Sequence, residues 1–242
     1  MYQPRTYRHW VKHKDLISFA VLVEETDCYI SATHNLQSKA RKLIIKHRET
    51  LKKFITEHPL FLTTLEPFPV DDSSPHIVKA MCQASAKVGV GPMASVAGAI
   101  AEFVGNELIA FSPEIIIENG GDIFLKSLKD RLVGIYAGSS PFTGKLGLEI
   151  DGRNTPLGIS TSSGTVGHSL SFGKADAVVV LAETAILSDA AATAIGNLII
   201  QASDIPKGIE FAKGVDGLKG IVIIKDDNIG VWGDIKLCKT HV

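Results

Sequence analysis

Short apolar runs alternate with turn residues along most of this chain, and these runs predict its strands. Residues 16–24 (LISFAVLVE) and 27–32 (DCYISA) are separated by only two residues, which predicts a β-hairpin. Similar runs predict further strands at residues 61–65, 114–118, 123–125, 132–137, 146–150, 158–161, 177–181, 220–225 and 228–233. The last two are separated by Asp226-Asp227, so the chain is expected to close with a second hairpin.

Helical spacing of apolar residues appears in four other stretches. Residues 35–58 place apolar side chains on one face and many Lys and Arg on the other, which predicts a long amphipathic helix. That basic face is either a solvated surface or a surface for an anionic partner. The other predicted helices cover residues 76–87, beginning with Ser74 as a cap before Pro75, then residues 93–104 and residues 189–201.

The order of these elements predicts the fold class. Strands come in hairpins that are followed by helices, and the helices predicted at 93–104 and 189–201 are both rich in Ala and Gly. This order favours a duplicated α+β domain over a doubly wound parallel sheet. Residues 66–75 (EPFPVDDSSP) contain three prolines and are the best candidate boundary. We expect one domain over residues 1–242, with internal halves formed by 1–70 plus 71–110 and by 111–242.

Composition narrows the functional classes. The chain has 242 residues, of which 45% are hydrophobic and 21% charged, with a net charge of −1, so a general nucleic-acid-binding role is not expected. The uncharged stretch 88–101 is too short for a membrane span, and the charged start does not resemble a secretion signal. We therefore expect a cytoplasmic protein whose Cys28, Cys82 and Cys238 are reduced thiols.

Asp189 and Thr193 are the strongest candidates for chemistry from spacing. They are four residues apart, so a helix places both side chains on one face, where oxygen atoms suit a hard cation such as Mg²⁺. The alternative is that Ser188 or Asp189 is the N-cap of the helix and that Thr193 only packs.

Three loops add further candidates, each with a plain structural alternative. Gly91 lies in a glycine turn before a helix, an arrangement that suits phosphate but is also common between helices. The segment 119–122 (NGGD) is typical of a hairpin turn, although its glycines also allow a ligand to approach the backbone closely. Residues 160–165 are rich in hydroxyl groups, and His168 follows them as either a general base or a structural histidine.

Four motifs together resemble the ApbE-like superfamily. They are GPMAS at 91–95, ENGGDI at 118–123, TSSG at 161–164 with His168, and LSDAAATA at 187–194. Members of that superfamily include Mg²⁺-dependent flavin transferases, which move FMN from FAD onto a Thr or Ser of a target protein. The resemblance implies an antiparallel β-sheet fold with helices packed on one side and duplicated halves, similar to a T-fold.

The resemblance also implies roles for individual residues. Mg²⁺ would be bound by Asp189, Thr193 and the backbone carbonyl near Ala94, and His168 would act as general base. FAD would lie along Asn119, Gly120, Gly121, Asp122, Ser162, Ser163 and Gly91. The chain departs from the transferases at Ser95, where they carry Lys, and no flavin-ring platform is matched in residues 1–70. Two functions follow: a flavin transferase or pyrophosphate-cleaving enzyme with a protein acceptor, or a non-catalytic small-ligand-binding or assembly protein. A homo-oligomer is compatible with either function.

Overall fold

The computed structural model describes residue 8 and residues 15–166 and 171–240, and most of its strands form one antiparallel sheet. This main sheet has eight strands in the spatial order β1-β2-β3-β4-β7-β8-β9-β10. Their bounds are β1 Ile17–Val23, β2 Thr26–Ala32, β3 Ile115–Asn119, β4 Asp122–Lys126, β7 Leu157–Ser162, β8 Ala177–Ala182, β9 Leu218–Lys225 and β10 Asn228–Gly233. Both predicted terminal hairpins are confirmed, since β1 pairs with β2 and β9 pairs with β10.

The sheet is built from two halves of the same design. In the first half the hairpin β1–β2 is followed by helices and then by the hairpin β3–β4, and in the second half β7–β8 is followed by helices and β9–β10. The symmetric division of the sheet falls between β4 and β7, which pair directly. The proline-rich connection at residues 66–75 instead joins two helices of the first half. The predicted α+β fold with duplicated halves is therefore confirmed, but the division between β4 and β7 differs from the predicted halves, 1–70 plus 71–110 and 111–242, because β3–β4 belongs to the first half.

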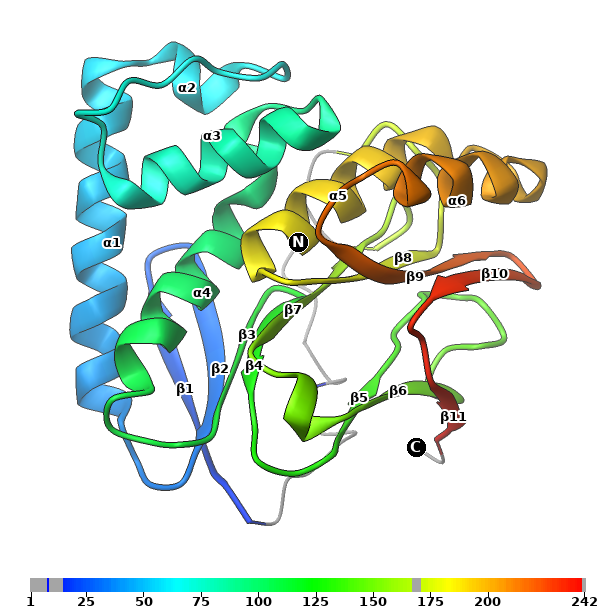
Figure 1. The fold of residues 1–242 in the computed structure, drawn as a ribbon, viewed down its shortest axis with the longest axis horizontal. Coiled ribbons are helices and arrows are strands. Elements are labelled where there is room, and N and C mark those ends of the chain that lie inside the picture. Colours follow the sequence, from blue (N-terminus) through cyan, green and yellow to red (C-terminus); the bar gives the residue numbers. More distant parts are fainter. Residues whose placement is uncertain (1–7, 9–14, 167–170, 241–242) are drawn as a thin grey trace.

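Helices cover one face of the main sheet, as Figure 1 shows. They are α1 Gln37–Glu57, α2 Leu60–Thr63, α3 His76–Val88, α4 Val96–Leu108, α5 Ala185–Leu198 and α6 Ile205–Lys213. Short 3-10 turns are η2 Pro92–Ser95, η3 Gly152–Asn154 and η4 Ala202–Asp204. Alternate strand residues such as Ile117, Val180 and Ile223 point into this helical layer and are fully buried.

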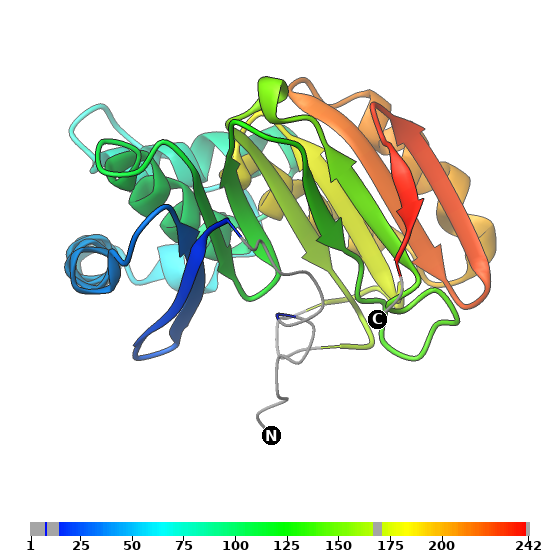
Figure 2. The ribbon, with the colours of Figure 1, turned by 90° about the horizontal axis from the view of Figure 1, so that it is seen from below.

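A second, smaller sheet covers part of the opposite face (Figure 2). Its order is β11-β6-β5, with bounds β5 Arg131–Gly134, β6 Leu146–Ile150 and β11 Leu237–Lys239. Leu148 of this sheet packs with Ile159 and Val179 of the main sheet in a second apolar cluster. Because both faces of β8 are covered, all six of its residues are buried, which explains its unbroken apolar sequence.

Local predictions fail in the segment that leads to α3. The strand predicted at residues 61–65 is wrong, because Leu60–Thr63 forms the short helix α2. A run of this length has no periodicity that separates strand from helix, and tertiary contacts decide between them. Phe61 is fully buried against Phe54 of α1, with ring centroids 5.1 Å apart. Ser74 makes no capping bond to α3, whose N-cap residue is Pro75.

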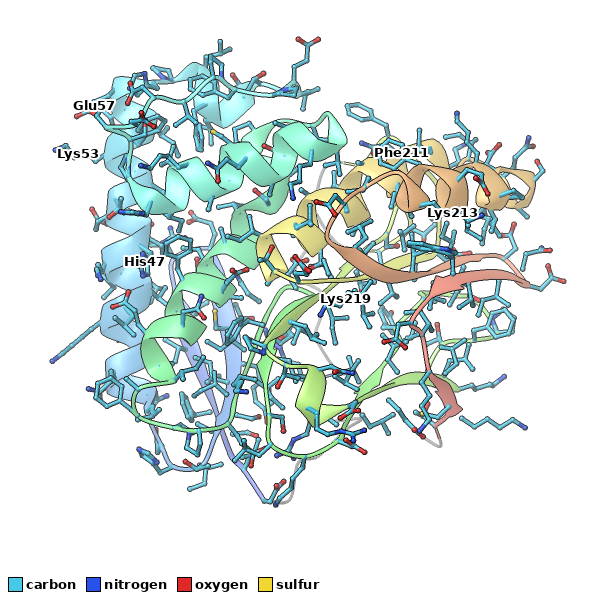
Figure 3. All side chains as sticks on the ribbon, in the orientation of Figure 1. His47, Lys53, Glu57, Phe211, Lys213 and Lys219 are labelled. Atoms are coloured by element: carbon cyan, nitrogen blue, oxygen red, sulfur yellow. The ribbon has the colours of Figure 1, made fainter. Side chains whose placement is uncertain are left out.

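Part of the basic face of α1 is paired with neighbouring acids. Arg48 bonds the carboxylates of Glu24 and Glu25 in the β1–β2 turn, and Lys46 bonds Glu107 of α4. Figure 3 shows Lys53 and Glu57 projecting from the helix away from the rest of the chain. These contacts favour a solvated surface over a site for an anionic partner.

Two predictions from composition concern membrane spans and the cysteines. Among the described residues no single helix is long and apolar enough to cross a bilayer, and α3 with the segment Pro92–Leu108 reaches that length only as a pair bent by 102°. Cys28, Cys82 and Cys238 are all free thiols in the described chain.

Candidate functional site

The start of α5 lies earlier than the sequence suggests. Thr184 is its N-cap, and the Thr184 hydroxyl accepts a hydrogen bond from the amide of Leu187 at 3.1 Å. The prediction that Ser188 or Asp189 caps this helix is therefore wrong, because Thr184 already supplies the cap and both residues lie in the helix interior. Ser188 is fully buried, and its hydroxyl bonds that of Ser160 on β7 at 2.7 Å.

Asp189 instead reaches across to the first turn of α4. Its Oδ2 accepts a hydrogen bond from the amide of Gly98 at 2.8 Å, and the amide of Ala97 also bonds the carboxylate. Ser95, the N-cap residue of α4, provides no side-chain cap, so Asp189 satisfies these two donors from a different helix. A carboxylate in this place is stabilised by the positive end of the α4 dipole.

The NGGD turn brings a second carboxylate to the same place. Gly120 and Gly121 have φ angles of 73° and 106°, which glycine adopts without strain and which close the β3–β4 hairpin. The side-chain amide of Asn119 donates to the carbonyl of Ala97 in α4 at 3.0 Å. Asp122 is 8% exposed and is directly paired with Asn119 across the hairpin. Because paired residues share a face of the sheet, both side chains lie under the helices.

Asp122 and Asp189 are neighbouring carboxyl groups that interact directly. The pKa of Asp189 is raised well above the ordinary Asp value, first by loss of hydration and next by the negative charge of Asp122. Bonds from the α4 amides oppose this rise by stabilising the carboxylate. Asp189 is only partly buried, so part of its surface stays accessible. Two carboxylates this close need a proton or a cation between them.

A hard divalent cation fits the atoms present. Thr193 follows Asp189 by four residues, so its hydroxyl lies one turn further along the same face of α5, and it is partly exposed. Carboxylate and hydroxyl oxygens are the ligand types that Mg²⁺ prefers. Within the described chain no three His, Cys, Asp or Glu side chains gather as a metal cluster. The remaining ligands would therefore be hydroxyl, backbone, water or phosphate oxygens.

The hydroxyl-rich loop after β7 borders the same face of α5. Ser162 lies beside Gly196 of α5, where an added Cβ would be 3.2 Å from the Ser162 hydroxyl. The Ser163 hydroxyl accepts hydrogen bonds from the amides of Thr165 and Val166 at 3.1 and 3.0 Å. Ser163 thus shapes the loop. The predicted base His168 lies outside the described residues.

Structural contacts account for the glycine turn before α4. A Cβ on Gly91 would lie 1.9 Å from the carbonyl oxygen of Thr64, so glycine is required there by packing. Ala94 donates its amide to the Gly91 carbonyl at 3.1 Å within η2, which contacts α5. Ser95 is fully buried, and its hydroxyl donates to the carbonyl of Pro92 at 2.8 Å. The position where the transferases carry Lys therefore points into the protein here.

Of the residues predicted to form the site, the structure brings Asp189, Asp122 and Asn119 together. Packing against Thr64 accounts for Gly91, and His168 is not among the described residues. Sequence reasoning missed the amides of Ala97 and Gly98, which complete the site. Their only sequence signal is the small residues at the start of α4, which permit close helix packing without indicating what packs there.

The sequence of this chain matches a protein family and several known proteins. The family model described as AbpE bacteria matches residues 8–210. A UPF0280 protein of Methanococcus aeolicus is 44% identical over 201 residues, covering 81% of each chain, and a UPF0280 protein of Methanococcus vannielii is 41% identical over 227 residues, covering 91% and 92%.

Among solved structures, the apo form of the flavinyl transferase ApbE of Pseudomonas stutzeri has a similar fold. Its TM-score is 0.59 at 14% sequence identity, and the match covers 90% of this chain and 94% of that chain. Identity this low shows the fold alone. The extent of the family match, together with the relatives above 40% identity, shows that this chain belongs to the AbpE bacteria family, on the fold of the ApbE flavin transferases.

Proposed function

We propose that this protein binds FAD, or a closely related nucleotide diphosphate, together with Mg²⁺ at the Asp122–Asp189 pair. The single observation that carries the proposal is this pair of adjacent carboxyl groups at the start of α4, with part of Asp189 accessible. A bound cation would neutralise the pair and would polarise the diphosphate oxygens. Thr193 would supply a further oxygen from the same helix face.

The surrounding residues suit the rest of such a ligand. Gly120 and Gly121 present backbone without side chains beside Asp122, so a nucleotide can approach the turn closely. Asn119 is fixed by its bond to α4, which holds the turn against the helix that Asp189 caps. The site is therefore assembled from β3–β4, α4 and α5, and little rearrangement is needed before binding.

In a transfer reaction the hydroxyl oxygen of an acceptor protein attacks the phosphorus on the FMN side of FAD. The new P–O bond replaces the bond to AMP, and the hydroxyl proton passes to a base, a role that the resemblance assigns to His168. With water as the acceptor, the products are FMN and AMP.

A second function is binding without turnover. The buried Ser95 favours it, because its hydroxyl is directed to the Pro92 carbonyl and no cationic side chain reaches the ligand from this position. The two functions share the metal site and differ only in whether products form.

The test is a titration with FAD, with and without Mg²⁺, followed by flavin fluorescence and by chromatography of FMN and AMP. Wild-type protein is expected to show saturable, Mg²⁺-dependent binding. Asp189→Asn is expected to lose the Mg²⁺ dependence while remaining folded, because the Asn side-chain oxygen still accepts from Gly98. The exposed Asp227→Asn is the matched control and should bind as wild type.

Each outcome has a defined meaning. Release of AMP supports the enzyme, and binding without products supports the ligand-binding protein. Absence of binding in both conditions, or an unchanged Mg²⁺ dependence in Asp189→Asn, overturns the proposal.

A further inference from the structure

The first turn of α5 is held by an acidic residue of α4. The carboxylate of Glu102 accepts hydrogen bonds from the amides of Ile186, at 3.2 Å, and Ala185. The next amide, of Leu187, bonds the Thr184 hydroxyl. The amides of the first three residues of α5 therefore all have side-chain oxygen acceptors, and two of these amides donate to a residue of another helix.

The same relation holds in the opposite direction. Asp189 of α5 accepts the amides of Ala97 and Gly98 in the first turn of α4. Gly98 and Glu102 are four residues apart, as are Ala185 and Asp189, so each pair lies on one face of its helix. Each helix thus donates its first-turn amides to a carboxylate of the other helix.

Close packing locks this arrangement. A Cβ on Gly98 would lie 2.2 Å from the carbonyl oxygen of Ala185 and 2.9 Å from the Cβ of Asp189. The backbones of α4 and α5 are therefore in direct contact where each helix accepts the first-turn amides of the other with a carboxylate. A shift of one helix along the other would break the hydrogen bonds at both helix starts.

We propose that Glu102 is a positioning residue for the Asp189 site, acting through the backbone of α5. We call Gly98, Glu102, Ala185 and Asp189 the reciprocal clamp. Glu102 sets the register of α5 on α4, and this register places the Asp189 carboxylate beside Asp122. The proposal rests on the proposed function for its effect on Mg²⁺, whereas the clamp itself is tested without metal.

The experiment compares Glu102→Ala and Glu102→Gln with Glu107→Ala. Glu107 is an acidic residue of the same helix, but its carboxylate bonds Lys46 and His47 of α1, so it controls for loss of a helix contact. Two quantities are measured: hydrogen exchange of the amides in both first turns, and the Mg²⁺ concentration at half-maximal FAD binding.

Glu102→Ala is expected to accelerate exchange at Ile186 and also at Gly98, which Glu102 does not itself bond, by about fivefold or more, since a lost helix cap has an effect of that order. The Mg²⁺ midpoint should rise by a similar factor. Glu102→Gln keeps an acceptor oxygen and should fall between Glu102→Ala and wild type. Glu107→Ala should change neither quantity.

An increase in exchange confined to Ala185 and Ile186, with Gly98 and the Mg²⁺ midpoint unchanged, would show an ordinary cap and overturn the proposal. If Glu102→Ala does not fold, Glu102→Asp, which is one methylene shorter, takes its place with the same expectations. If wild-type protein shows no Mg²⁺-dependent binding, the proposed function fails, while the exchange at Gly98 still decides whether the clamp exists.

Discussion

Substitution of Gly98 by alanine tests how closely α4 and α5 approach each other. The new Cβ would lie 2.2 Å from the carbonyl oxygen of Ala185, about 1.2 Å short of ordinary contact, which begins at 3.4 Å. Because the obstacle is backbone within a buried helix, no side-chain rotation relieves it. The helices must separate, and the bond from Gly98 to Asp189 must lengthen.

The expected change in the free energy of unfolding is the sum of one stabilising and two destabilising contributions. Replacing Gly by Ala in a helix interior stabilises by about 1 kcal/mol. Overpacking at a close contact costs about 1–3 kcal/mol, and loss of a helix-capping bond costs about 1 kcal/mol. We expect a net loss of about 2 kcal/mol, which for a chain of this size lowers the melting temperature by about 4–8 °C.

Thermal denaturation of Gly98→Ala beside Gly196→Ala measures this effect. Gly196 is also a helix glycine, but its Cβ would meet only the Ser162 hydroxyl at 3.2 Å and the Ser162 Cβ at 3.6 Å, so a slight shift of that side chain accommodates it. Gly196→Ala should be near neutral. If Gly98→Ala is as stable as wild type or more stable, helix propensity alone acts there, and the close contact that underlies the site is refuted.

Two further predictions concern groups away from the site. Burial lowers the pKa of His47 (Figure 3) below its ordinary value of 6.5. Burial alone would raise the pKa of Glu107, but hydrogen bonds from Lys46 and His47 outweigh this effect and hold it below the ordinary 4.5. Both shifts give stability that is present above the unfolded pKa value of the group and is lost as pH falls below it. The contribution of His47 is therefore lost below about pH 6.5 and that of Glu107 only below about pH 4.5. The urea midpoint should decrease between pH 7 and 5 because of His47, less so in His47→Leu; equal slopes would contradict this. Arg131→Met leaves the buried carboxylate of Glu114 without its guanidinium partner, so the free energy of unfolding should fall by about 3–5 kcal/mol in thermal denaturation. The double variant Arg131→Met/Glu114→Gln should restore part of this stability. A loss below about 1 kcal/mol in Arg131→Met would refute the role of this pair.

Periodic segments were predictable because their local pattern and their burial agree. The hairpin β1–β2 and the helix α1 lie within a few residues of their predicted bounds. In β1 and α1 mainly one face is buried, and a single buried face produces a clear period of two or 3.6 residues. The segment at residues 61–65 had no such period, and its helix depends on the contact of Phe61 with Phe54.

The candidate site was predictable only in part. The spacing of Asp189 and Thr193 indicates a shared helix face from sequence alone. The partner of Asp189 is not indicated, since a carboxylate near a helix start looks the same whether it caps its own helix or another. Thr184 has the same capping chemistry as Ser188, and the structure selects the earlier residue.

The sequence by itself determined the paired strands, the small-residue helices and the oxygen-bearing residues, because these depend on the identity and spacing of neighbours along the chain. Only the tertiary structure decided that Asp122 lies beside Asp189. It also decided that Glu102 of α4 accepts first-turn amides of α5, and that Asp189 of α5 accepts first-turn amides of α4. The physical reason is that these contacts join residues more than 60 positions apart. Their partners are set by the packing of α4 on α5, which allows the two backbones to meet because Gly98 has no side chain.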